Sequence, residues 1–280
     1  MNAPSPSGNI RSFDLVASDL DGTLLGWDEK VSPRTRLAIK RVLASGARFV
    51  FATGRPPRWI RPVAEEVEHF GFAVGSNGAV IVEVHSDPLL DRVVRSNLLS
   101  IEVALRSIEA VRRALPGVAF AVDSPDGFGH EPHYVPSWET PGKVAIAPVD
   151  QLVNGPLLKI LFKHPEMNES NYRKVIDIVG DTASITFGSM VPIPGHNTLI
   201  ELMAPGCSKA SALQWICDHD GIHSDRVIAF GDMPNDLEML AWAGHGVAMG
   251  NAHDTIKAVA NAVTLSNSED GVAHILEQYF

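Results

Sequence analysis

The stretch Val16-Ala-Ser-Asp-Leu-Asp-Gly-Thr-Leu-Leu25 joins a mostly apolar run to a glycine turn and carries two aspartates at the junction. The run at residues 13–17 predicts a buried strand that ends where the polar residues begin. Asp19 and Asp21 are two residues apart, so in extended chain both side chains face one pocket. Two carboxylates in one small site repel unless a cation or a shared proton separates them. The pair therefore indicates either a hard metal ion such as Mg²⁺ or a division of roles between a nucleophile and an acid or base.

Composition and charge narrow the class of protein. The chain has 280 residues, enough for a core domain with a smaller second domain, and 45% of them are hydrophobic. A net charge of −10 argues against nucleic acid or an anionic membrane as a partner. Cys207 and Cys217 have neither metal-site nor disulfide spacing, which favours reduced thiols in the cytoplasm. Residues 1–12 predict a disordered tail without a signal peptide, and no apolar run has membrane-spanning length.

Strands and helices alternate at both ends of the chain. After the aspartate pair, helices are predicted to begin at Pro33 and Pro57, with strands at 47–52 and 72–74 and extended chain at 79–84. The pattern returns near the C-terminus, with helices at 209–219, 237–242 and 255–260, strands at 226–230, 246–249 and 262–265, and a last helix from 268. This order predicts a parallel sheet with helices on its faces.

The middle of the chain has a different pattern. We expect helices at 98–115 and 168–180, strands at 118–123, 157–163 and 183–187, and an irregular stretch rich in His, Pro and Gly. These strands are more polar and alternating, which is typical of a sheet with one open face. The sequence thus predicts an α/β class, with a Rossmann-like parallel-sheet core at 13–85 and 195–280 and an inserted α+β domain at 86–194.

Polar residues follow three of the apolar runs. Asp19 and Asp21 follow the first run, Thr53 follows the second, and Asp232 with Asp236 follows a third. Because ligands of open α/β sheets lie beyond the carboxyl ends of the strands, we expect these side chains to meet at one edge.

Four motifs in this order resemble those of the haloacid dehalogenase (HAD) superfamily: Asp19-Leu20-Asp21-Gly-Thr-Leu, Ala52-Thr53-Gly54-Arg55, Lys209, and Gly231-Asp232-x-x-Asn235-Asp236. Further segments are similar to its Cof-like branch, which inserts a large α/β cap between the second and third motifs: Ser76-Asn77-Gly78-Ala79, Val247-Ala-Met-Gly-Asn251-Ala, and Asn267-x-Glu-Asp-Gly-Val. The resemblance covers residues 13–280 of the core and only loosely the cap.

The resemblance implies a role for each acidic residue. Asp19 would attack a phosphoryl group and form an aspartyl-phosphate. Asp21 would protonate the leaving alcohol and then accept a proton from water. Mg²⁺ would be held by the Asp19 carboxylate, the Asp21 backbone carbonyl and Asp232, with Asp236 in support.

The same resemblance implies phosphate contacts. Thr53 and Lys209, together with backbone amides of the first loop at Leu20, would bind the phosphoryl oxygens whose charge develops in the transition state. The remaining residues expected at the phosphate or substrate are Gly54, Arg55, Asn77, Gly78 and Asn235.

These implications point to a Mg²⁺-dependent phosphatase acting on a small phosphorylated metabolite, a sugar phosphate or a phosphorylated cofactor. A phosphohexomutase of the same capped branch shares all these residues and stays an alternative. A receiver-like signalling protein or a non-hydrolysing relative that binds a phosphorylated ligand is a further alternative, against which the acid/base residue Asp21 argues.

Two other groups have weaker signals. His130-Glu-Pro-His133 resembles half of a zinc site, but Pro132 interrupts a helix, and we expect a cap loop or a substrate contact instead. For Arg58 and Arg61 we expect a solvated helix face in preference to the alternative, direct binding of substrate.

Overall fold

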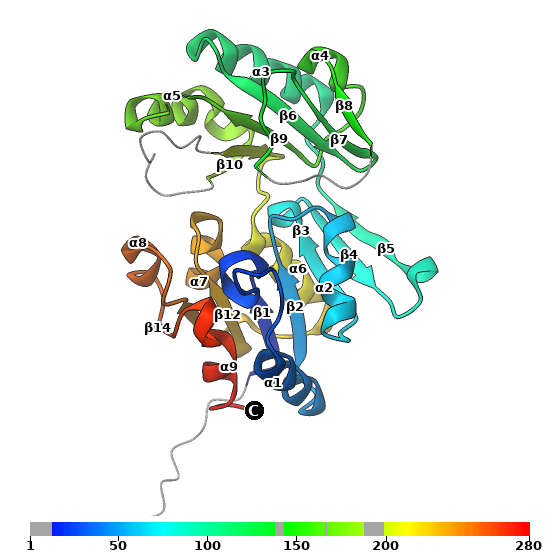
Figure 1. The fold of residues 1–280 in the computed structure, drawn as a ribbon, viewed down its shortest axis with the longest axis vertical. Coiled ribbons are helices and arrows are strands. Elements are labelled where there is room, and N and C mark those ends of the chain that lie inside the picture. The colour runs from blue at the N-terminus through cyan, green and yellow to red at the C-terminus, as the bar shows by residue number, and fades with distance from the viewer. Residues whose placement is uncertain (1–12, 138–142, 166, 188–198) are drawn as a thin grey trace, which may run out of the picture.

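The computed structural model describes residues 13–137, 143–165, 167–187 and 199–280, and the predicted tail at 1–12 lies outside them. The described residues form an eight-stranded sheet and a six-stranded sheet, which belong to two domains stacked one above the other (Figure 1). Within these ranges no helix is both long enough and apolar enough to cross a membrane. The α/β class that the sequence predicts is confirmed.

The larger sheet forms the core domain, with strand order β14-β13-β12-β1-β2-β3-β4-β5. Its strands are β1 (Leu15–Ser18), β2 (Arg48–Ala52), β3 (Gly71–Gly75), β4 (Val80–Val84), β5 (Arg92–Ser96), β12 (Val227–Gly231), β13 (His245–Ala248) and β14 (Ala262–Val263). Parallel pairing joins β14 through to β3, with β1 in the middle between β12 and β2. The central strand therefore ends at the aspartate pair.

The sheet departs from the predicted parallel arrangement at one edge, where β4 and β5 are antiparallel. The turn at Ser76–Gly78 causes the reversal, because its three residues have φ angles of +48°, +54° and +99°. Left-handed backbone at successive residues folds the chain back on itself within one turn.

Helices cover both faces of the core sheet. Helices α1 (Pro33–Ala44), α2 (Arg61–Glu66) and α9 (Gly271–Leu276) pack on one face, and α6 (Lys209–Asp220), α7 (Leu237–Trp242) and α8 (Asp254–Lys257) pack on the other. The central strands are apolar on both sides and are buried between the two layers of helices, whereas the edge strands β5 and β14 remain partly exposed.

The smaller sheet forms the cap, with order β10-β11-β9-β6-β7-β8. Its strands are β6 (Ala119–Ser124), β7 (Gly127–His130), β8 (Val144–Ile146), β9 (Lys159–Lys163), β10 (Ser184–Phe187) and β11 (Ile200–Met203). Helices α3 (Ile101–Ala114), α4 (Val149–Leu152) and α5 (Glu169–Val179) pack on one face. The other face turns toward the core (Figure 1). The stretch predicted as irregular contains β7.

Two strands belong to a different sheet from the one that the predicted domain boundaries imply. Strand β5 falls in the range expected for the cap but extends the core sheet, whereas β11 falls in the core range but pairs with β9 and β10 in the cap sheet. We therefore propose that the cap spans about residues 97–204, in place of 86–194.

Candidate active site

Three predicted site residues meet in the interior at the carboxyl end of β1. The Nζ atom of Lys209 lies 2.7 Å from Oδ1 of Asp19 and 2.7 Å from Oδ1 of Asp236. Lys209 begins α6, directly after Ser208, whose hydroxyl accepts a hydrogen bond from the backbone amide of Ser211 and caps the helix. This N-terminal capping by Ser208 fixes the residue at which the helix starts. The start in turn places the Lys209 side chain between two carboxylates that are far apart in the sequence.

The loop after β12 positions Asp232 beside this group. The second oxygen of Asp236 accepts hydrogen bonds from the backbone amides of Asp232 and Met233, each 3.0 Å long. Asp232 in turn accepts a 2.8 Å hydrogen bond from the hydroxyl of Thr23. Asn251 donates to the carbonyl of Gly22 at 2.8 Å and lies 3.5 Å from Asp232. The Asp232 carboxylate is thus held from two sides.

The acidic residues fit a divalent cation. Oxygen atoms of Asp19, Asp232 and Asp236 all lie within 4.8 Å of one another, and all three residues are buried. Burial, with the neighbouring Asp236 and Asp232, raises the pKa of Asp19 well above its usual range, although Lys209 opposes the shift. Burial and the charge of Asp236 raise the pKa of Asp232 to about 7. One lysine among these carboxylates leaves negative charge that a hard cation bound by oxygen ligands would offset.

Asp21 does not share the pocket of Asp19 as the alternation of a strand predicts. Strand β1 ends at Ser18, and residues 20–24 form a helical turn, so the two-residue period no longer applies. The Asp21 side chain is 58% exposed and pairs with Arg55, which donates to its two oxygens at 2.9 and 2.5 Å. Its carboxylate is not part of the acidic cluster. The expected metal contact through its backbone carbonyl stays a prediction.

The loops that carry the predicted phosphate-binding residues contact one another. Thr53 is fully buried, and its hydroxyl accepts a 3.0 Å hydrogen bond from the backbone amide of Arg55. Its carbonyl accepts from the backbone amide of Asn77 at 3.0 Å. The Asn77 side chain accepts from Asn235 at 2.9 Å, so the loops after β2, β3 and β12 contact one another. A β-carbon at Gly54 would lie 3.2 Å from Oδ1 of Asn77.

Two more predicted residues belong to these loops. Gly78 has a φ of +99°, and a β-carbon there would lie 2.6 Å from the carbonyl carbon of Ser208, next to Lys209. Leu20 is fully buried in the turn after Asp19. Their expected contacts with substrate stay predictions.

Arg58 and Arg61 form specific ion pairs on the helix face that was expected to be solvated, and Arg58 remains exposed. Arg58 forms a 2.8 Å ion pair with Asp123, which lies on cap strand β6 and is 3% exposed at its side chain. Arg61 pairs with Asp91 at 2.5 Å, in the loop that joins β4 to β5. Each arginine of this segment therefore has a specific acidic partner.

In the His130-Glu-Pro-His133 motif, Glu131 and His130 make contacts within the cap. The carboxylate of Glu131 accepts from Arg112 and from the backbone amide of Phe120, and Nδ1 of His130 faces the Glu131 carbonyl. Within the described ranges, His130 and His133 belong to no cluster of three metal-ligating side chains.

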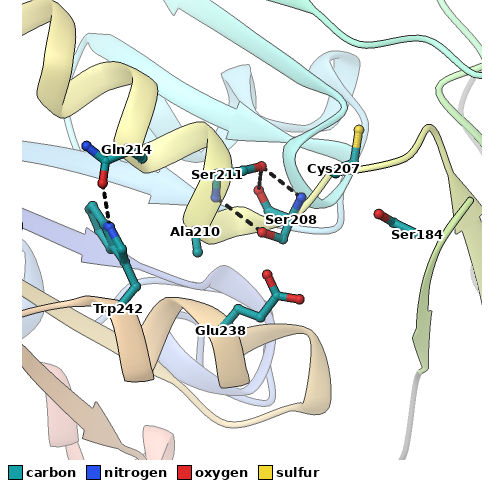
Figure 2. A pocket seen from close by; sticks show the side chains of 9 residues that line it. Ser184, Cys207, Ser208, Ala210, Ser211, Gln214, Glu238 and Trp242 are labelled. Carbon is teal, nitrogen blue, oxygen red and sulfur yellow. Dashed lines mark hydrogen bonds between the residues drawn. The ribbon is translucent and has the colours of Figure 1, made fainter. Parts of the chain in front are cut away.

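A pocket of about 350 Å³ lies near the acidic cluster but has a different lining. It includes Ser184 of β10, Ser208 and Ala210 on either side of Lys209, and Glu238 and Trp242 of α7 (Figure 2). Lys209 and the other predicted site residues do not line it.

Four polar residues with contacts at the site lack a predicted role. Asn251 belongs to a quoted motif, and Thr23 lies in the first motif, so both could have been found from neighbouring residues. Lys159 and Glu201 lie on cap strands and contact Gly54 and Asn77. A single charge in a mostly apolar strand does not show from sequence that the residue contacts the site.

The comparison with known proteins agrees with this geometry. The model of the haloacid dehalogenase-like hydrolase family matches residues 16–276. The chain therefore belongs to the haloacid dehalogenase-like hydrolases. The expected class, a Cof-like phosphatase of this superfamily, is confirmed.

Individual relatives match over nearly their whole length. The 5-amino-6-(5-phospho-D-ribitylamino)uracil phosphatase YitU of Bacillus subtilis is 33% identical over 267 residues, covering 95% of this chain and 97% of YitU. YcsE of the same organism has the same activity in its name and is 28% identical, covering 95% of each chain. The structure of BT1666 from Bacteroides thetaiotaomicron, studied among HAD phosphatases, has a TM-score of 0.80 at 25% identity and covers 100% of this chain and 99% of its own.

Proposed function

We propose that this chain is a Mg²⁺-dependent phosphatase that hydrolyses a small phosphorylated metabolite through an aspartyl-phosphate at Asp19. The observation that carries the proposal is the buried Asp19 carboxylate, in contact with Lys209 and beside Asp232 and Asp236. A carboxylate held against an ammonium at the end of a central strand is a nucleophile with a fixed direction of attack.

The residues divide the hydrolysis into two steps. An oxygen of Asp19 bonds to phosphorus while the bond from phosphorus to the ester oxygen breaks, and protonated Asp21 gives its proton to the leaving alcohol. Water then attacks the aspartyl-phosphate, Asp21 takes a proton from it, and the bond between phosphorus and Asp19 breaks to release inorganic phosphate. Lys209 and Thr53 stabilise negative charge on the phosphoryl oxygens in both steps.

Asp19, Asp232 and the backbone carbonyl of Asp21 would hold the metal, with Asp236 close by. Bound there, Mg²⁺ supplies positive charge that offsets the repulsion between an anionic phosphate and an anionic nucleophile. Two free, buried thiols, Cys207 and Cys217, support the proposed cytoplasmic location.

The proposed substrate is a sugar phosphate or a phosphorylated cofactor or precursor. Two relatives are named as phosphatases of a uracil that carries a phosphorylated ribityl chain. Such a compound has both a sugar-like phosphate and the ring of a cofactor precursor. We propose that this chain acts on a phosphate ester of similar size, a primary alcohol on a polyol or sugar.

The test is phosphate release from a panel of sugar phosphates, polyol phosphates and phosphorylated cofactors, with Mg²⁺ and with excess chelator. We expect turnover of at least one compound, full loss in chelator, and loss of several orders of magnitude in Asp19→Asn with an unchanged fold. Intact mass of Asp21→Asn after mixing with substrate should show an added phosphoryl group. Sugar phosphate isomerisation without phosphate release would replace the proposal with the mutase alternative, and full activity in chelator would contradict the metal.

A further inference from the structure

Three charged side chains of the cap sheet are buried on the face that turns toward the core. Asp123, Lys159 and Glu201 are 2%, 3% and 8% exposed and lie on the adjacent strands β6, β9 and β11. Asp123 and Lys159 are register partners across β6 and β9. Because burying a charge without a partner is very unfavourable, the partners of these groups decide what the cap face is built to contact.

Lys159 and Glu201 reach two loops of the active site. The Nζ atom of Lys159 donates to the carbonyl of Gly54 at 2.9 Å and pairs with one oxygen of Glu201. The other oxygen of Glu201 accepts a 2.7 Å hydrogen bond from the side-chain amide of Asn77. Asn77 accepts from Asn235 at 2.9 Å, so a continuous chain of polar contacts runs from the cap sheet to the loop after β12.

A second contact joins the two domains, next to the contacts that Lys159 and Glu201 make with the core. Arg58, which follows the Thr53–Arg55 loop, donates to Asp123 at 2.8 Å. The four side chains of these contacts carry two positive and two negative charges, so docking of the cap leaves no net charge at this junction. Three of the four side chains are buried and Arg58 is partly exposed, so the neutral set stabilises one arrangement of the two domains.

The contacted loops bear directly on the phosphate site. Asn77 has a φ of +54°, a conformation that a non-glycine residue adopts only when its surroundings hold it. Its backbone amide donates to the Thr53 carbonyl at 3.0 Å, and its side chain would touch a β-carbon at Gly54. Lys159 and Glu201 therefore hold both sides of the contact between the Gly54 loop and Asn77.

We propose that Lys159 and Glu201 are positioning residues that couple docking of the cap to completion of the phosphate-binding loops. With the cap docked, Lys159 fixes the peptide that follows Gly54, and Glu201 fixes Asn77 between itself and Asn235. When the cap is displaced, both loops lose a charged partner, and the phosphoryl group meets an incomplete site. This inference rests on the proposed phosphatase function.

Lys159→Met tests the coupling, and Lys163→Met is its matched control. Lys163 is a second buried lysine on the same face of β9, but its partners are Ser137 and the Val135 carbonyl within the cap. With p-nitrophenyl phosphate, Lys159→Met should lower kcat by about 30-fold or more, because misplaced binding groups act on the transition state. Lys163→Met should keep kcat within about threefold of the wild type, with a similar fall in Tm.

Variants of Glu201 give an independent measurement if Lys159→Met does not fold. Glu201→Gln keeps an acceptor for Asn77 and should retain most of the kcat that Glu201→Leu loses. Because the two residues act as one unit, Lys159→Met combined with Glu201→Leu should be little slower than the slower single variant.

Two results would overturn the coupling. One is a kcat of Lys159→Met equal to that of Lys163→Met. The other is a loss confined to kcat/KM of the larger metabolite ester with p-nitrophenyl phosphate unaffected, which would make Lys159 a contact of the leaving group. A wild-type protein that hydrolyses no phosphate ester would instead contradict the proposed function itself.

Discussion

The Nζ atom of Lys209 lies 2.7 Å from Oδ1 of Asp236, and neither side chain exposes measurable surface to solvent. The pair joins the start of α6 to the loop after β12, and Asp19 is the third member of the contact. Burial alone would lower the pKa of Lys209, but the carboxylates of Asp19 and Asp236 together raise it above its ordinary value. The lysine is therefore charged, and it offsets part of the repulsion that a cluster of buried carboxylates creates.

Lys209→Met should destabilise the fold as well as abolish turnover. It leaves two buried carboxylates without their cation, which should lower the free energy of unfolding by about 3–5 kcal/mol in the absence of Mg²⁺. Urea denaturation measures the change. Lys40→Met, which breaks an exposed pair with Glu68, should leave the free energy of unfolding nearly unchanged. Equal effects of the two variants would mean that the buried lysine has no structural role.

Gly22→Ala should weaken metal binding. Gly22 has a φ of +76°, and a β-carbon there would lie 2.9 Å from Cγ of Asp232. Gly221 has a similar φ of +70° with no atom within 4 Å of a β-carbon, so Gly221→Ala is the control for backbone strain alone. Displacing Asp232 should raise the Mg²⁺ concentration for half-maximal phosphate release by about tenfold or more. The same Mg²⁺ requirement in both variants would contradict a metal contact by Asp232.

Arg55→Ala should act on substrate binding and on proton transfer together. Both oxygens of Asp21 accept from Arg55, so Asp21 must give up one of these bonds before it protonates a leaving group. We expect KM to rise about tenfold and kcat/KM to fall about 100-fold, because the phosphate loses a nearby cation and Asp21 loses its orientation. Arg61→Ala removes the same side-chain type from the pair with Asp91 and should change neither constant. Steady-state kinetics of both variants measure KM and kcat/KM, and equal constants in the two variants would contradict a role of Arg55 at the site.

The sequence predicted which acidic residues come together better than it predicted the domain junction. Asp19, Thr53 and Asp232 each follow an apolar run, and parallel strands bring such positions to one edge whatever their separation in the chain. The same logic did not extend to Asp21, because β1 ends at Ser18 and the chain then leaves the extended conformation. Pairing with Arg55 depends on a side-chain contact across 34 positions, which no local pattern shows.

The junction between core and cap required the three-dimensional structure. Lys159 and Glu201 are each a single charge within a mostly apolar strand, and nothing in the sequence shows what such a charge contacts. Their burial follows from docking of the cap sheet on the core loops, which is a long-range event. The predicted domain boundaries assigned β5 and β11 to the wrong domains for a similar reason. The sheet to which a strand belongs depends on its pairing partners and not on the residues of the strand itself.

His69 should make the stability of the core depend on pH. The ring lies against Phe49 and Phe51, Nε2 donates to the Phe49 carbonyl at 2.6 Å, and burial lowers the pKa of His69 below its ordinary value of 6.5. The unfolded chain therefore binds a proton more readily than the fold does. Stability from neutral His69 is complete above pH 6.5 and is lost as the pH falls from there toward the lower pKa of the folded state.

The prediction separates His69 from the other histidines. Urea midpoints of the wild type should fall between pH 7 and pH 5.5, and His69→Gln, which keeps a hydrogen-bond donor without a titrating ring, should flatten that fall at some cost in stability at pH 7. His223→Gln is the control, because the His223 side chain is 82% exposed, and its pH dependence should match that of the wild type. If His69→Gln and His223→Gln lost stability equally between the two pH values, protonation of His69 would not be the cause of the acid sensitivity.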